Sequence, residues 1–169
     1  IDSFKIEGRM KTALYVATVA RTYRKAIDDC LESEEKYRAN MEWYHREISR
    51  CTYRQFTTGF YYGKPNEESQ IYDSNTYQSD AVYLGTVYET DHKGRARIEQ
   101  RNKFCVGDVI EIMKPDGRNV ACQVLQIQDD QEEKMESAPH PKQELWLTLS
   151  EAAETGDLLR TIVEKETDE

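Results

Sequence analysis

The chain has 169 residues and a formal net charge of −9 at pH 7, from 23 Lys and Arg against 32 Asp and Glu. This length allows one good hydrophobic core. No apolar run approaches the ~20 residues that cross a bilayer, so we expect a cytoplasmic protein without membrane contact. The acidic excess falls in residues 55–169, which excludes a broad nucleic-acid surface there because such surfaces depend on Lys and Arg.

The four cysteines lack the spacing of a metal site or a disulfide framework. Cys30, Cys51, Cys105 and Cys122 are far apart, and none belongs to a C-x-x-C pair. Free cysteine is among the most frequently buried residue types, so we expect packed thiols in a reducing cytosol and no metal. The chain begins with Ile, and we expect it to be a processed or truncated part of a longer protein.

The first thirty residues predict a strand, a turn and a long helix, which is one βα step. Ile1 to Ile6 alternate as a strand does, and Gly8 interrupts the pattern. A helix is expected from Met10 to about Leu31–Ser33. Its apolar residues predict one buried stripe, formed by Ala13, Val16, Ala17, Ala20, Tyr23, Ile27 and Leu31. Beside the stripe we expect solvated charges, namely Arg21, Arg24, Lys25, Asp28 and Asp29.

A second helix is predicted over residues 40–49, with Asn40 as its N-cap, and the two helices should pack as an antiparallel hairpin. The following residues, 50–65, have no helical period and combine aromatic, glycine and basic residues. Two interpretations fit this composition. The aromatic rings could contact RNA bases or a sugar–phosphate group, or they could hold the two parts of the chain together.

From Ala81 onward the apolar period changes to two, which is typical of strands. Candidate strands lie near residues 82–88, 95–99, 104–113, 119–128, 145–149 and 158–163. Pro115-Asp116-Gly117 between two of them is a strong turn signal. A series of short strands with no helix among them predicts a small closed antiparallel barrel or a sandwich.

The residues that catalyse known reactions are scarce in this chain. His45, His92 and His140 do not stand beside Cys or Asp at the spacing of a nucleophile and its base. No P-loop and no G-x-S-x-G or H-E-x-x-H motif occurs. We therefore expect the chain to be catalytically inert by itself.

One short segment, Glu7-Gly8-Arg9-Met10-Lys11, has the composition of an anion site. A glycine lets a ligand approach the backbone, and the N-terminus of the following helix favours negative charge. Arg9 and Lys11 could bind a carboxylate or phosphate, with Glu7 orienting one of them. A plain surface turn with a weak ion pair is the alternative.

Several segments of the chain resemble peptidase family U32, also called the collagenase-like proteases. The resemblance is carried by Ser3–Lys11, Tyr15–Val19, Tyr23–Asp28, Phe56–Tyr61, Asn102–Phe104 and Gly107-Asp108. It implies the last strand and helix of a TIM-like barrel, followed by a β-barrel similar to domain 2 of translation elongation factors. Glu7, Gly8, Arg9 and Lys11 occupy the family's E-G-R-x-K positions, without individual roles.

The activities that this resemblance implies are divided. Some members of the family are described as proteases. Others act in RNA hydroxylation, including the prephenate-dependent formation of 5-hydroxyuridine in tRNA, or in quinone hydroxylation with an iron–sulfur cluster. The cluster cysteines of the hydroxylases lie upstream of the matched region, so a cluster is expected only in a preceding part of the parent protein, and no cofactor is expected here.

We therefore predict an α+β chain with three parts. Residues 1–54 end the main U32 domain, residues 55–80 form an aromatic and basic connector, and residues 81–169 form a C-terminal β-barrel. The expected partners of the chain are the upstream catalytic barrel and a protein or RNA substrate. The first functional hypothesis is an accessory domain of a U32 peptidase that recruits substrate or stabilises that barrel.

The alternative hypothesis is the C-terminal part of a tRNA-modifying U32 protein. In that protein the chain would help to bind RNA. Its expected contact residues are Arg50, Arg54, Tyr61 and Lys64.

Overall fold

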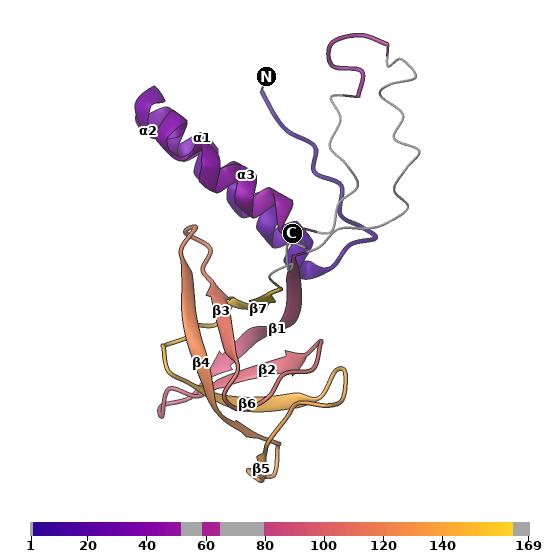
Figure 1. Ribbon diagram of the computed structural model, residues 1–169, viewed down its shortest axis with the longest axis vertical. Coiled ribbons are helices and arrows are strands. Elements are labelled where there is room, and N and C mark those ends of the chain that lie inside the picture. Colours follow the sequence, from indigo (N-terminus) through magenta and orange to yellow (C-terminus); the bar gives the residue numbers. More distant parts are fainter. Residues whose placement is uncertain (1, 52–58, 65–79, 164–169) are drawn as a thin grey trace, which may run out of the picture.

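The computed structural model describes residues 2–51, 59–64 and 80–163. Within them the chain forms three helices followed by seven strands, which confirms the α+β class (Figure 1). The helices are α1 (Ala13–Glu32), α2 (Glu34–Ala39) and α3 (Met41–Ser49). The strands are β1 (Ala81–Thr90), β2 (Ala96–Gln100), β3 (Val109–Met113), β4 (Asn119–Gln128), β5 (Lys134–Met135), β6 (Glu144–Leu149) and β7 (Leu158–Ile162).

The side chain of Thr12 caps the start of α1, and Ser33 separates α1 from α2. The Thr12 hydroxyl accepts a hydrogen bond from the Tyr15 amide at 3.3 Å, and α1 ends at Glu32, as the sequence predicts. Ser33 then accepts from the Lys36 amide at 3.1 Å and begins α2. The sequence patterns did not predict this short helix, although Ser followed by Glu34 and Glu35 is typical of a helix N-terminus.

A buried carboxylate joins α1 to α3. Asp29 accepts hydrogen bonds from the Tyr44 hydroxyl at 2.6 Å and from the Asn40 amide and the Lys25 ammonium at 2.9 Å each. Asn40 occupies the N-cap position of α3, but its side chain caps no backbone amide. The predicted helical hairpin is therefore present, and its Asn40 acts through a tertiary hydrogen bond.

The prediction of a strand over the first eight residues is wrong, because residues 2–8 have no strand conformation. A strand needs a neighbour that pairs with its backbone N–H and C=O groups. None of the described strands pairs with this segment. Phe4 instead packs against Tyr23 of α1, with the ring centroids 5.6 Å apart.

Six of the strands close into an antiparallel barrel, which confirms the predicted architecture. The order is β3-β7-β1-β2-β6-β4, and β3 pairs with β4 to complete the ring. The described strand β5 pairs with β4 beside it. The barrel encloses a core of alternating inward residues, which include Leu84, Ile98, Ile112, Val124, Leu145 and Leu159. Closure leaves no open sheet edge in the ring.

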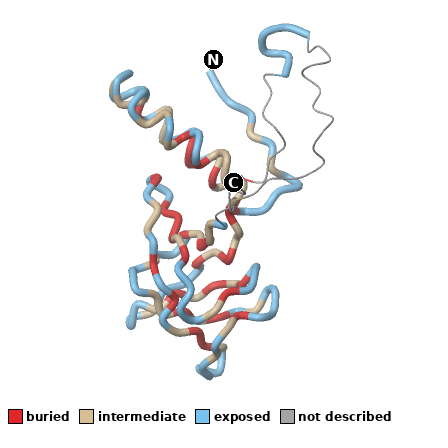
Figure 2. Tube along the Cα trace, in the orientation of Figure 1, coloured by how far each residue is buried: buried red, intermediate tan, exposed pale blue. Residues whose placement is uncertain are grey.

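The turn between β3 and β4 reaches the helices. Gly117 has φ of +95°, and a Cβ at this position would lie 2.7 Å from the Lys25 Cδ atom and 3.6 Å from the Trp43 ring. Glycine satisfies both the backbone and the space. The barrel and the helices are in direct contact, because Arg21 of α1 donates to the Lys114 carbonyl at 3.0 Å and to the Asn119 side chain at 2.9 Å. Figure 2 shows buried residues in the helical part as well as in the barrel.

The predicted buried stripe of α1 is wrong, because the opposite side of the helix faces the barrel. Val16, Tyr23 and Leu31 are 41%, 40% and 79% exposed. The buried residues of α1 are Leu14, Thr18, Arg21, Thr22 and Asp29. Apolar spacing located the amphipathic helix correctly, but ion pairs decide which side packs on the barrel.

No helix in the described ranges is long and apolar enough to cross a membrane.

Candidate functional site

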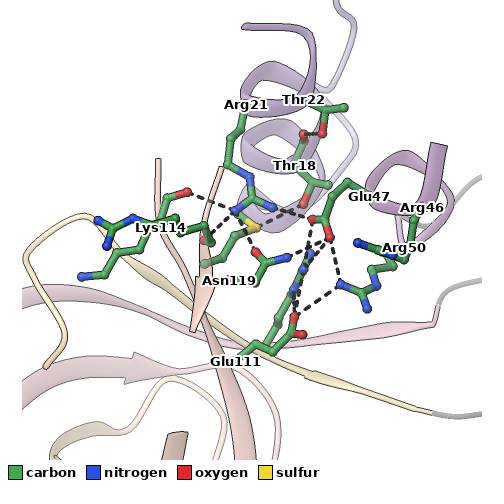
Figure 3. A network of polar contacts seen from close by, with 12 residues as sticks. Thr18, Arg21, Thr22, Arg46, Glu47, Arg50, Glu111, Lys114 and Asn119 are labelled. Atoms are coloured by element: carbon green, nitrogen blue, oxygen red, sulfur yellow. Dashed lines mark hydrogen bonds and ion pairs between the residues drawn. The ribbon is translucent and has the colours of Figure 1, made fainter. Parts of the chain in front are cut away.

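The junction between helices and barrel is built around Glu47 of α3, whose side chain is fully buried (Figure 3). Its carboxylate accepts hydrogen bonds from the Arg21 guanidinium of α1 and, at 3.0 and 3.1 Å, from the Arg160 guanidinium of β7. The Asn119 amide of β4 donates to it at 2.9 Å. One carboxylate therefore joins two helices to two strands.

Two further residues extend this cluster toward its solvent-facing side. Arg50 donates to Glu47 at 2.8 Å and lies 3.5 Å from the Glu111 carboxylate of β3. Glu111 also accepts from Arg160 at 2.9 Å. The Glu47 cluster, as we call it, consists of Arg21, Glu47, Arg50, Glu111, Asn119 and Arg160.

The charges of the Glu47 cluster stabilise the ionised carboxylate. Burial acts to raise the pKa of Glu47, but the charges of Arg160, Arg21 and Arg50 outweigh it and hold the pKa below its ordinary value. A buried charge needs such partners because its desolvation is otherwise very costly. The cluster is therefore a structural joint, and Arg50, a predicted RNA contact, is engaged in it.

A cleft of about 220 Å³ lies next to this joint, between α1 and the start of β1. Arg50 and Tyr15 line it from the helical side, and Tyr83 and Asn102 line it from the barrel side. The Lys11 ammonium lies 5.4 Å from the centroid of the Tyr15 ring. The structure thus places one residue of the predicted anion segment beside a cleft that Arg50 lines, a proximity that sequence spacing did not indicate.

The rest of the predicted anion segment has local partners. The Glu7 carboxylate accepts from the Arg9 amide at 3.1 Å, and it lies 3.8 Å from the Arg9 guanidinium. A Cβ on Gly8 would lie 2.5 Å from a methyl carbon of Val16. Close packing against α1 therefore accounts for this glycine. The arrangement favours the surface-turn interpretation for Glu7, Gly8 and Arg9.

The described part of the connector is an exposed turn of aromatic residues. Phe60, Tyr61 and Tyr62 are 79%, 72% and 84% exposed, and Lys64 is also exposed. The Gly63 amide donates to the Phe60 carbonyl at 3.2 Å. Tyr61 and Lys64 therefore lie together at an accessible position, whereas the predicted contact Arg54 lies outside the described residues.

A second group of aromatic and basic residues lies on the barrel. Arg95 and Arg97 lie 5.0 and 5.7 Å from the centroid of the Trp146 ring. Carboxylates pair with both arginines, namely Glu89, Asp91, Asp130, Glu132 and Glu144. The positive charge of this group is therefore neutralised within the barrel, which makes it a poor site for a polyanion.

Two family models match consecutive parts of the chain. The model of peptidase family U32 matches residues 1–71, and the model of the peptidase family U32 C-terminal domain matches residues 79–160. The chain belongs to peptidase family U32. This finding confirms the resemblance that the sequence carries.

The relatives found in this family have two kinds of name. The tRNA hydroxylation protein P1 of Bacillus subtilis is 32% identical over 95% of this chain, and the tRNA hydroxylation protein P of Escherichia coli is 30% identical over 91%. An uncharacterized protease of Methanocaldococcus jannaschii is 32% identical over 72% of the chain. The chain spans 38%, 33% and 30% of these three relatives' lengths.

A solved structure also matches part of this U32 chain. It is the selenomethionine variant of the C-terminal domain of a Geobacillus thermoleovorans protein described as a U32 peptidase. The match has a TM-score of 0.44 and 26% sequence identity, and it covers 47% of this chain and 99% of that structure.

The cysteines of this U32 chain do not fit an iron–sulfur cluster. All four are free, with Cys51 and Cys122 buried and Cys30 exposed. Burial raises the pKa of the Cys51 and Cys122 thiols to about 11 each, so both are neutral thiols at pH 7. In the described ranges, no three His, Cys, Asp or Glu residues are grouped so that they could hold a metal ion.

Proposed function

We propose that this chain is the C-terminal part of a U32 protein that acts in tRNA hydroxylation, and that it helps the parent protein to bind RNA. The observation that carries the proposal is the name shared by the Bacillus subtilis and Escherichia coli relatives, which match 95% and 91% of the chain. This supports the alternative of the two functional hypotheses more strongly than the peptidase hypothesis.

The distribution of charge is compatible with RNA binding by one part of the chain. Residues 50–64 contain Arg50, Arg54 and Lys64 and no acidic residue. Because Arg50 pairs with Glu47 and Glu111 in the Glu47 cluster, Arg54 and Lys64 are the basic residues of this segment that we propose for phosphate contacts. Residues 80–163 contain ten Lys and Arg against 16 Asp and Glu. Since phosphate contacts depend on basic residues, the connector is the proposed RNA contact, and the acidic barrel is not.

The outer side of α1 supports a protein partner. Its exposed apolar residues, with Phe4 and Tyr37, line a hollow of about 310 Å³ that also includes Tyr23, Ala26, Ile27, Cys30 and Leu31. Contiguous exposed apolar residues of this kind mark interaction surfaces. We propose that the upstream catalytic barrel of the parent protein covers this side of α1, and that the Glu47 cluster holds the β-barrel at a fixed angle to it.

Binding of unmodified tRNA by the full-length protein tests the RNA proposal. The association constant should fall steeply as salt rises from about 50 to 200 mM, because basic residues release counterions from the phosphates. Hydroxylated uridine, measured by mass spectrometry in tRNA from a deletion strain, should return with the full-length gene and not with a gene lacking residues 50–163. Salt-independent or undetectable tRNA binding would overturn the proposal.

The peptidase hypothesis is a second candidate, because one relative is named a protease. Here the barrel would recruit a protein substrate. Peptide cleavage that is lost on deletion of residues 80–163, with tRNA hydroxylation unchanged, would favour this function over RNA modification.

A further inference from the structure

We propose that Phe60, Tyr61 and Tyr62 form a stacking platform for unpaired bases of an RNA. This inference rests on the proposed function in RNA modification, and it specifies both the contact residues and the single-stranded character of the bound RNA. We call these three residues the aromatic tip.

The geometry of the aromatic tip leaves its rings accessible. All three side chains are at least 72% exposed. The Tyr61 and Tyr62 rings meet edge to face, with centroids 4.9 Å apart and an angle of 85° between their planes, so each ring keeps a face open to solvent. Figure 1 draws the aromatic tip in magenta, away from the helices and the barrel.

The backbone of the turn presents these side chains together. The Gly63 amide closes the turn by donating to the Phe60 carbonyl at 3.2 Å, and Gly59 and Gly63 have φ of +52° and +139°. Glycine is the residue that adopts such angles without strain. Two glycines therefore bracket three consecutive aromatic residues in a tight turn, which prevents the rings from spreading along an extended chain.

Nucleobases are the occupant that best matches the composition around the aromatic tip. Three large exposed rings in a row are unfavourable in water and indicate a partner. Lys64 follows the turn directly, and residues 50–64 contain no acidic residue that would repel phosphate. Aromatic rings beside basic residues are the combination with which proteins bind single-stranded nucleic acid, because every base has a face that can stack.

The aromatic residues on the barrel provide a contrast within the same molecule. Trp146 also has arginines over its ring, but the carboxylates of Glu89, Asp130 and Glu144 pair with Arg97 there. A polyanion would meet repulsion at that surface. The aromatic tip, in contrast, is followed directly by Lys64, and residues 50–64 contain no acidic residue; the acidic residues that follow in the sequence are Glu67 and Glu68.

Fluorescence anisotropy with the 169-residue chain tests the platform, using a labelled oligouridylate of about 12 nucleotides and a duplex RNA of equal length. The wild type should prefer the single strand, because duplex bases are already stacked. The triple variant Phe60→Ala/Tyr61→Ala/Tyr62→Ala should lose at least about tenfold in affinity for the single strand, with an unchanged salt slope.

Two control variants separate stacking from charge and from the tyrosine hydroxyls. Tyr61→Phe/Tyr62→Phe keeps the rings and should bind as the wild type does. Lys64→Ala should weaken the binding of both RNAs. For the single strand it should make the slope of log K against log salt less steep by about 0.7, the value for one phosphate contact. Circular dichroism of each variant should match the wild type, because the substituted side chains are exposed.

Three results would overturn the platform: equal single-strand affinity of the triple variant and the wild type, a preference for the duplex, or no binding of either RNA by the wild-type chain. The failure of the proposed function is a separate result. If the full-length protein binds tRNA and the triple variant of that protein binds it equally well, the platform is wrong and the RNA function stands.

Discussion

Replacing Glu47 by Gln should destabilise the junction between helices and barrel. The substitution keeps the size of the side chain and removes the buried negative charge that binds Arg21, Arg50 and Arg160. The Glu47 cluster then keeps one carboxylate, that of Glu111, which pairs with Arg50 and Arg160. Two donor atoms of the cluster, Arg21 Nε and Arg160 Nη1, already lack a hydrogen-bond partner among the described residues.

The magnitude follows from the burial of these groups. Breaking a buried ion pair by removing one partner costs about 3–5 kcal/mol, because the other charge is left uncompensated. For a chain of this size, each kcal/mol lowers Tm by about 2–4 °C, so we expect a decrease of roughly 6–20 °C. Urea unfolding followed by circular dichroism measures the free energy of unfolding directly.

The pH dependence of this difference is a second test. The pKa of Glu47 in the folded protein lies below the ordinary value of 4.5. The ionised carboxylate therefore contributes its full stability above about pH 4.5, and this contribution is lost as pH falls through the folded-state pKa. The stability difference between the wild type and Glu47→Gln should be constant near neutral pH and should narrow under acid conditions.

Glu42→Gln is the matched control, because Glu42 lies in the same helix and is exposed. It should change the free energy of unfolding by less than about 1 kcal/mol. Equal destabilisation by the two substitutions, or a Glu47→Gln effect that does not change with pH, would refute the assignment of Glu47 as the charged joint.

Three further predictions concern other parts of the fold. Tyr44→Phe removes a hydrogen bond to the Asp29 carboxylate. Burial acts to raise the pKa of Asp29, but hydrogen bonds from Tyr44, Lys25 and Asn40 outweigh it and lower the pKa to about 2. The substitution should cost about 1.5–3 kcal/mol at pH 7 by urea unfolding and less as pH falls from 4 toward 2, because Asp29 then protonates. Gly85→Ala should cost about 1–3 kcal/mol, because its Cβ would lie 2.8 Å from a backbone carbonyl of β2; an unchanged urea midpoint would contradict this packing. Burial raises the pKa of Cys51 to about 11, so iodoacetamide should modify this thiol only on unfolding, and rapid labelling of the native protein would argue against its burial.

The sequence by itself determined the local structure and the family. Period-two alternation predicted the six strands of the barrel, and Pro115-Asp116-Gly117 predicted the turn that joins β3 to β4. Helical spacing located α1 and α3. These features depend on residues that are close in sequence, so a pattern can reveal them. The run of aromatic residues between glycines was likewise visible in the sequence, but its exposure came only from the structure.

Only the tertiary structure decided how the parts meet. The helix α1 has an apolar side and a charged side. The charged side packs on the barrel because Arg21 donates to the Lys114 carbonyl and to the Asn119 side chain there, while it pairs with Glu47 of α3, which in turn accepts from Arg160 of β7. Arg21, Glu47 and Arg160 lie in α1, α3 and β7, and no spacing connects them. The conformation of residues 2–8 also depended on distant parts of the chain, since a strand exists only where another strand pairs with it. Charges buried by distant partners, and strands that need neighbours, depend on long-range contacts that a linear pattern does not contain.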